Sequence, residues 1–168
     1  MHLRADRDAL LLADTFVFSL SAEESAALVD SLNRHFAPTL QFEPLSSGRW
    51  YARLDAPSAL HWTPLADVRG KPVTLHLPQG DGAMRWNALV NEMQMLLHAH
   101  PINTQREARG ELPVNSVWLW GEGRHARLAT PTGPATRPYG RAFANDPLAR
   151  GLAMASGGSA SALPASAA

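Results

Sequence analysis

The stretch AMRWNALVNEMQMLLHA, residues 83–99, decides the fold that the sequence predicts. Its apolar side chains recur every three or four residues, which is the period of an amphipathic α-helix. The turn QGDG precedes the stretch, with Asp81 as the expected N-cap, and Pro101 follows and ends the helix. The side chains expected on the core-facing stripe are Trp86, Leu89, Val90, Met93, Leu96, Leu97 and His100.

Before this helix, the sequence predicts one further helix and four strands. Ser21 followed by Glu24 is a capping box, so a helix should begin there and end at Pro38. Short apolar or alternating runs around turn residues predict the strands. These strands are DTFVFSL (14–20), the hairpin pair TLQFEPL (39–45) and RWYARLD (49–55) around SSG, and KPVTLHLP (71–78).

After the helix, VNSVWLW (114–120) predicts a last strand, and DPLARGLAMA (146–155) a short helix. The element order predicts an α+β fold: an antiparallel or mixed sheet with two main helices on one face, an irregular C-terminal arm and a disordered tail. We expect the domain over residues 14–123, the arm over 124–157 and the low-complexity tail over 158–168.

Composition limits the functional classes. The chain has 168 residues, 45% of them hydrophobic, with a formal net charge of zero and no cysteine. Thiolate chemistry is therefore excluded, and no global charge favours nucleic acid or an anionic membrane. No apolar run reaches the roughly 20 residues of a membrane helix, and the run ALLLA near the N-terminus is too short for a signal peptide. We expect a cytoplasmic protein without nucleic-acid or membrane partners.

A second stripe of the helix is polar but uncharged. It carries Asn87, Asn91, Gln94 and His98, whereas exposed helix faces usually carry charged residues. Amides are buried favourably only when their donors and acceptors find partners. The stripe therefore indicates either a hydrogen-bond network that holds the following loop or one wall of a small-molecule pocket.

The pair His98 and His100 predicts no metal site. Positions i and i+2 of a helix point about 200° apart, so the two rings cannot share an ion. We expect His100 to act as a cation at the helix end or to cap the last carbonyls.

The loop after the helix holds the remaining candidate groups. Asn103 and Asn115 are typical of Asx-turns. Arg106 offers a guanidinium fork to a carboxylate or phosphate ligand, or a salt bridge to Glu111 or another acidic residue. Trp118 and Trp120 would share one face of the last strand, as core or as the wall of a pocket. No catalytic motif is present. The candidate ligand-binding residues are Asn91, Gln94, His98, Asn103, Arg106 and Asn115, with no catalytic or metal-ligating residue and no cofactor.

The run NEMQMLLHAHPINTQREARGELPVNSVWLWGEG (91–123) resembles the signature of RpfE-type regulatory proteins. That family is related to the archaeal-type cofactor-independent phosphoglycerate mutases, in the domain inserted into their alkaline-phosphatase-like core. The resemblance covers roughly residues 14–157, including RWYARLD (49–55) and YGRAFANDPLARGLA (139–153). The positions that match the motif are His100, Pro101, Asn103, Arg106, Gly110, Pro113, Asn115, Gly121 and Gly123.

The resemblance implies binding without catalysis. In the mutases, the phosphorylated serine and the two-metal ligand set lie in the phosphatase core, and nothing in this sequence matches that core. We therefore expect a non-catalytic regulatory or ligand-binding domain that takes a small anionic metabolite. The alternative is a phosphoglycerate mutase-type enzyme, which isomerises 3-phosphoglycerate to 2-phosphoglycerate, or a fragment of one.

Two kinds of protein partner are expected from uncovered apolar surface. One is a second copy in a homodimer, and the other is the missing C-terminal region of a longer family member. The surface would lie on the far side of the last strand, at Val117 and Leu119, or on the C-terminal arm. The apolar residues of the arm are Tyr139, Phe143, Leu148, Leu152 and Met154.

Overall fold

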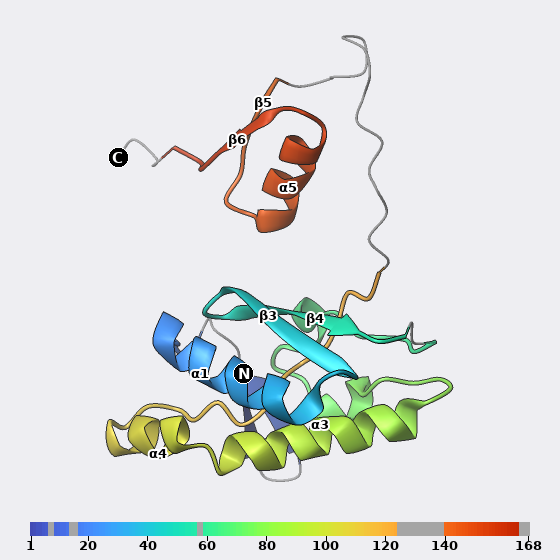
Figure 1. Ribbon diagram of the computed structural model, residues 1–168, viewed down its shortest axis with the longest axis vertical. Coiled ribbons are helices and arrows are strands. Elements are labelled where there is room, and N and C mark those ends of the chain that lie inside the picture. Colours follow the sequence, from blue (N-terminus) through green and yellow to red (C-terminus); the bar gives the residue numbers. More distant parts are fainter. Residues whose placement is uncertain (7–8, 14–16, 57–58, 124–139, 165–168) are drawn as a thin grey trace. The chain divides into compact units, whose positions relative to one another are not determined.

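The computed structural model describes residues 1–6, 9–13, 17–56, 59–123 and 140–164. It divides into two compact units, Met1–Glu122 and Gly123–Ala168. The predicted α+β class is confirmed: helices stand beside three two-stranded sheets, two of them antiparallel (Figure 1). The elements of the first unit are β1 (His2–Asp6), β2 (Ala9–Ala13), α1 (Ala22–Phe36), β3 (Leu40–Ser46), β4 (Arg49–Leu54), α2 (Leu65–Val68), the 3₁₀ helix η1 (Val73–His76), α3 (Ala83–His98) and α4 (Pro101–Ala108).

Helix α1 begins at the predicted capping box. The Ser21 hydroxyl accepts from the Glu24 amide at 3.1 Å, and the Glu24 carboxylate accepts from the Ser21 amide at 3.0 Å. Leu28 and Leu32 are fully buried in a cluster with Leu40 and Phe42 of β3. Figure 1 shows helix α1 lying beside β3. The cap therefore fixes where the helix starts, and its apolar stripe fixes which side enters the core.

The predicted hairpin of β3 and β4 is also confirmed, with Phe42 opposite Ala52. Its outer edge at β3 is closed by one side chain from α1. Asn33 donates its Nδ2–H to the Phe42 carbonyl at 2.9 Å and accepts from the Phe42 amide at 2.7 Å. The Asn33 amide group thus takes the place of a neighbouring strand, so that the backbone N–H and carbonyl of Phe42 are not left unpaired at this edge.

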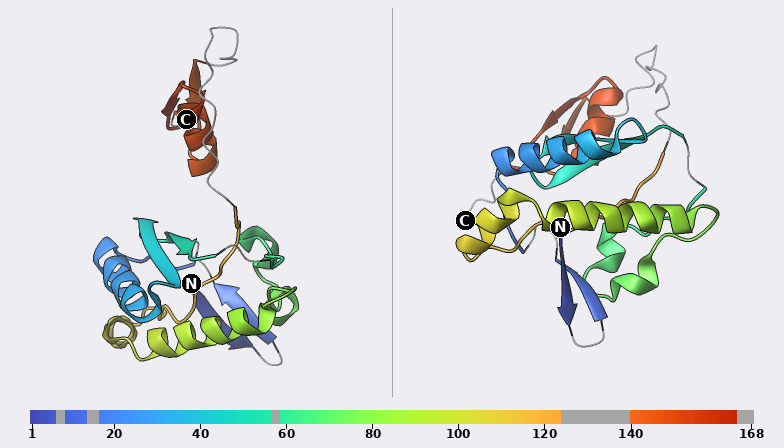
Figure 2. Two further views of the ribbon diagram at one scale, coloured as in Figure 1. Left: turned by 45° about the vertical axis from the view of Figure 1, so that its right-hand side comes forward. Right: turned by 60° about the horizontal axis from the view of Figure 1, so that its bottom comes forward.

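Helix α3 agrees with the predicted helix to within one residue, and Met93 and Leu97 are fully buried. Its N-cap, however, is Gly82, whose φ of 89° lies in the left-handed region, rather than Asp81. Figures 1 and 2 show α3 and α4 following one another on the side of this unit away from the β3–β4 hairpin. The main core collects residues of α1, β3, α3 and the segment after α4: Leu28, Val29, Leu32, Phe36, Leu40, Phe42, Met93, Leu97, Val114 and Val117.

Three predicted strands are wrong. Residues 17–20 carry no strand, and the rest of the predicted strand 14–20 lies outside the described residues. Residues 71–78 contain η1 instead, because Pro72 has no N–H for a ladder and Val73 is buried in a second core with Leu12 and Val68. Residues 114–120 are extended but form no ladder.

The two tryptophans of that extended segment do not share one face. Trp118 donates its indole N–H to the Thr63 carbonyl at 2.8 Å, whereas Trp120 is 45% exposed beneath the Arg49 guanidinium. Val117 and Leu119 pack into the main core. The prediction that these two residues form an exposed far face is therefore wrong.

Strands β1 and β2 and helix α4 are among the elements that the sequence analysis did not predict. Strands β1 and β2 form an antiparallel hairpin in which Leu3 stands opposite Leu12, and the right-hand view of Figure 2 shows it extending past α3. Helix α4 begins at Pro101, the residue expected only to end α3. Proline is favoured at the first position of a helix because its missing N–H would have no partner there.

The second unit contains β5 (Arg141–Phe143), α5 (Pro147–Ala155) and β6 (Ser159–Ser161). The predicted short helix is confirmed, and β5 and β6 pair in parallel. Strand β6, Ser159–Ser161, lies at the start of the stretch expected to be a disordered tail. Tyr139 lies outside the described residues. The other apolar residues of the predicted arm, Phe143, Leu148, Leu152 and Met154, are each more than half exposed within this unit. The domain limits proposed from the sequence stay a prediction.

The hairpin edge gives a first testable prediction. Asn33→Ala removes both hydrogen bonds to Phe42 and should lower the free energy of unfolding by about 1–3 kcal/mol, since the Phe42 backbone groups lose their partners. Denaturant titration followed by circular dichroism measures the change. Asn91→Ala, at an exposed position of α3, is the control and should stay within about 0.5 kcal/mol. Equal effects of the two substitutions would contradict this role of Asn33.

Candidate functional site

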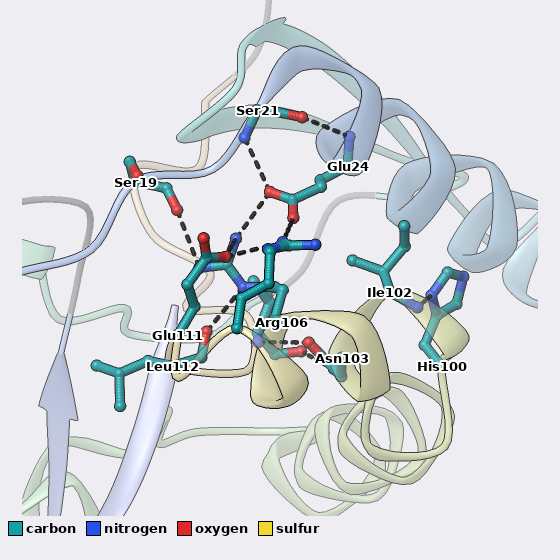
Figure 3. Close-up of polar contacts among 11 residues, drawn as sticks. Ser19, Ser21, Glu24, His100, Ile102, Asn103, Arg106, Glu111 and Leu112 are labelled. Carbon is teal, nitrogen blue, oxygen red and sulfur yellow. Dashed lines mark hydrogen bonds and ion pairs between the residues drawn. The ribbon is translucent and has the colours of Figure 1, made fainter.

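Arg106 on α4 is the most deeply buried charged group of the described residues, at 2% exposure. Its guanidinium is bonded on three sides by the protein itself. Nε donates to the Leu112 carbonyl at 2.8 Å, Nη1 to a Glu24 oxygen at 2.7 Å, and Nη2 to the Ser19 carbonyl at 3.0 Å (Figure 3). The partners come from two parts of the chain: Ser19 and Glu24 lie just before and at the start of α1, and Leu112 follows α4. Both parts therefore meet at this one side chain of α4.

Glu24 is the carboxylate on which these contacts converge. One oxygen accepts from Arg106 and from the Ser21 amide, and the other accepts from Arg109 at 2.6 Å. Arg109 also donates to Glu111 at 2.8 Å. Two arginines and two glutamates thus form a network without net charge, in which the inner pair is buried and the outer pair is about half exposed.

Arg109 and Glu111, the outer pair, shift each other's pKa. The hydrogen bond from Arg109 holds the pKa of the Glu111 carboxyl below its ordinary value, with a smaller contribution from the charges of Arg109 and Arg106. The hydrogen bond that Arg109 donates to Glu111 is the largest influence that raises the pKa of Arg109. Both groups therefore stay charged at neutral pH, and Glu111 loses its charge only below the ordinary range of a glutamate.

A groove of about 610 Å³ opens beside this network, between the start of α1 and α4. Ala27 and Ile102 give it an apolar part, and Arg109 and Gln105 are its exposed polar groups from α4. Its size lies within the ordinary range for small-molecule sites. The lining residues are Ser19, Ser21, Glu23, Glu24, Ala27, Ile102, Gln105, Arg106, Arg109 and Glu111.

Asn103 and Asn115 do not form the expected Asx-turns. Asn103 is 2% exposed and pairs with both backbone groups of Val114, accepting from its N–H at 2.7 Å and donating to its carbonyl at 2.9 Å. Asn115 pairs in the same way with the N–H and carbonyl of Leu3, at 2.7 and 2.9 Å. The two amides fasten the segment after α4 to α4 itself and to β1. Ser116 adds two backbone hydrogen bonds with Met1, at 3.1 and 3.3 Å.

The other predicted site residues lie apart from the groove. Gln94 donates to the Ser116 hydroxyl at 3.3 Å, while Asn91 and His98 are exposed on α3. Of the six residues predicted from the sequence, the structure brings Asn103 and Arg106 together on α4, and only Arg106 lines the groove. Whether the six bind a ligand stays a prediction.

Sequence reasoning missed Glu24 and Arg109. The capping box explains Glu24 by itself, which hides its second role as the partner of two arginines. The spacing of Arg106 and Arg109, one helical turn apart, carried a signal, since such residues share a helix face. Without the unpredicted helix α4, that signal could not be used.

His100 also differs from its predicted role. It does not cap the last carbonyls of α3 but is the N-cap of α4, where its ring nitrogen Nδ1 accepts from the Ile102 amide at 3.2 Å. An acceptor at this position must be unprotonated, so His100 is not the predicted helix-end cation.

Two further observations concern the described residues alone. Among them, no three His, Asp or Glu side chains lie close enough together to hold a metal ion. No helix among the same residues is long and apolar enough to cross a membrane.

Known proteins resemble this chain over much of its length. The family model of 2,3-bisphosphoglycerate-independent phosphoglycerate mutase matches residues 3–103. A relative from Geobacter sulfurreducens, a probable 2,3-bisphosphoglycerate-independent phosphoglycerate mutase, is 30% identical over 135 residues, which cover 77% of this chain and 33% of the relative. The mutase of Methanothrix thermoacetophila is 35% identical over 62% of this chain and 26% of its own length. The chain thus spans about a third or less of these relatives. No solved structure matches it.

The buried arginine gives a second testable prediction. Arg106→Ala leaves Glu24 without its inner partner, and breaking a buried pair on one side costs roughly 3–5 kcal/mol of unfolding free energy. Thermal denaturation should show a clear drop in melting temperature. Arg85→Ala, at an exposed position of α3, is the control and should change stability by no more than about 0.5 kcal/mol. An unchanged melting temperature for Arg106→Ala would show that Arg106 does not stabilise the fold.

Proposed function

The chain belongs to the 2,3-bisphosphoglycerate-independent phosphoglycerate mutase family, and from this premise we propose that it is a regulatory or ligand-binding domain rather than a catalyst. It corresponds to about a third or less of the relatives' length. On this proposal, it is an RpfE-type member that keeps a binding domain of the family. Its ligand is a small anionic metabolite bound in the groove between α1 and α4.

The single observation that carries this proposal is the environment of Arg109. This arginine is 47% exposed, lines the groove and already holds two carboxylates, at 2.6 and 2.8 Å. A guanidinium that binds carboxylates of its own protein has the geometry to bind the carboxylate or phosphate of a ligand. Glu111, itself 43% exposed, is the partner that a ligand would replace.

Arg106 supports the site rather than contacting the ligand. Each of its three nitrogens already donates to a protein oxygen, and its side chain is almost completely buried. Arg106 holds the Glu24 carboxylate in place by a hydrogen bond, and Glu24 in turn orients Arg109 by accepting a hydrogen bond from it. This moves the proposed anion contact from Arg106, as inferred from the sequence, to Arg109.

The charge of the groove limits what can bind. Three carboxylates, of Glu23, Glu24 and Glu111, face two guanidinium groups, so the lining carries one net negative charge. An anionic ligand therefore has to displace Glu111 from Arg109, because the two anions would otherwise repel each other at short range. We expect modest affinity that decreases with added salt.

This competition gives a third testable prediction. Glu111→Gln removes the competing charge and should tighten binding of 3-phosphoglycerate or inorganic phosphate by roughly two- to fivefold, the size of one exposed charge contact. Arg109→Gln should abolish binding. Isothermal titration calorimetry measures both. Arg85→Gln, a cation outside the groove, is the matched control and should bind as the unaltered chain does. Equal affinity of the Arg109→Gln variant would refute the site.

The second candidate function is catalysis, which the family match and the names of the relatives favour. A phosphoglycerate mutase-type enzyme, or a fragment of one, would convert 3-phosphoglycerate to 2-phosphoglycerate. The measurement is a coupled assay with purified chain and added manganese, in a preparation freed of the host's own mutase. We expect no turnover. Metal-dependent turnover would replace the binding proposal with the enzymatic one.

The proposed partners follow from the same premise. The exposed apolar residues of α5, including Leu148 and Leu152, are suited to contact either a second copy or the region by which longer relatives exceed this chain. Light scattering of the purified chain distinguishes the first possibility, since a homodimer doubles the mass of 18.2 kDa.

A further inference from the structure

His100 lies where three helices meet. It follows α3, forms the N-cap of α4, and faces α1 through the Ser31 hydroxyl. Nδ1 accepts from the Ile102 amide at 3.2 Å, and Nε2 lies 3.0 Å from the Ser31 oxygen (Figure 3 shows His100 with Ile102). One ring therefore joins the first turn of α4 to the middle of α1.

These contacts specify one protonation state of the ring. An amide can only donate, so Nδ1 must be a bare acceptor. The ring then carries its proton on Nε2 and donates it to the Ser31 hydroxyl oxygen, which also accepts from Arg34 at 3.1 Å. A second proton could enter only at Nδ1, where it would point at the Ile102 N–H and break the cap.

The charges around His100 also oppose a second proton. Arg34, on the same face of α1, is the charged group whose field acts on the ring, and Asp30 balances it from 3.2 Å. The neighbouring His35 is paired with Glu92 instead. Burial first, and the charge of Arg34 second, lower the pKa of His100 below its ordinary value.

We propose that His100 is a pH-sensitive latch that holds the start of α4 against α1 when neutral and releases it when protonated. The residues released lie on the first turns of α4, where Ile102 and Gln105 line the groove and Asn103 holds Val114. Acidification would thus loosen one wall of the groove. The latch itself does not depend on what the groove binds, and its test requires no ligand.

The sign of the effect follows from proton linkage. Because the latched form binds a proton less readily than the open form, the open form gains protons first as the pH falls below about 6.5. Opening is therefore favoured at acidic pH and is suppressed above that value. One pH unit below it, the equilibrium for opening should rise by up to about tenfold.

The experiment is amide hydrogen exchange of the α4 segment in the full chain between pH 7.5 and 5.5, corrected for the intrinsic pH dependence of exchange. We expect the protection of the amides of residues 102–106 to fall by up to about tenfold at pH 5.5. His100→Asn keeps a side-chain acceptor at the N-cap but cannot titrate, so its protection should not change with pH. His98→Asn, an exposed histidine two residues earlier, should behave as the unaltered chain does.

A nuclear magnetic resonance titration of the histidine rings gives an independent readout on the unaltered chain, which covers the case that His100→Asn does not fold. We expect the ring of His100 to titrate below about 6.5, with its neutral form protonated on Nε2. The latch is refuted if His100 titrates at or above that value. It is equally refuted if the His100→Asn variant keeps the pH dependence of the unaltered chain.

Discussion

A buried guanidinium needs hydrogen-bond acceptors for its N–H groups, and much of this fold is arranged to supply those acceptors to Arg106. Removing a charge from water costs several kcal/mol unless it is paired and hydrogen-bonded. The Leu112 carbonyl, the Glu24 carboxylate and the Ser19 carbonyl meet this requirement from two parts of the chain, the residues around the start of α1 and those after α4. The hydrogen bonds of Arg106 therefore constrain the position of α4 relative to α1, and apolar side chains pack around them.

A second constraint is that buried backbone groups also need partners, and here neutral asparagine side chains supply them. Asn33, Asn103 and Asn115 each offer one donor and one acceptor to both backbone groups of a distant residue: Phe42, Val114 and Leu3. Each amide takes the place of one strand residue in a ladder, since buried backbone groups must be paired by something. In this way, side-chain amides hold extended segments in place among the described residues, which form three two-stranded sheets.

The candidate site grows out of this scaffold. Glu24 caps α1, neutralises Arg106 and orients Arg109, so one carboxylate serves both the stability of the fold and the electrostatics of the groove. The outer pair, Arg109 and Glu111, is exposed enough to exchange partners, while the inner pair is not.

The sequence by itself determined the elements that local signals specify. The capping box at Ser21, the turn between β3 and β4, and the apolar period of α3 each depend on residues close together in the chain, and each was predicted correctly. Only the tertiary structure decided the rest. Helix α4 is short, and what holds it is the cap by His100 and the contacts of Asn103 and Arg106 with distant segments, none of which a local period can reveal. The segment after it reads as a strand but joins no ladder: Asn103 pairs with both backbone groups of Val114, and Ser116 exchanges two backbone hydrogen bonds with Met1. The candidate site divides in the same way between local signals and tertiary contacts. The sequence indicated Arg106, but it did not indicate that Glu24, more than eighty residues away in the chain, pairs with Arg109, the accessible cation.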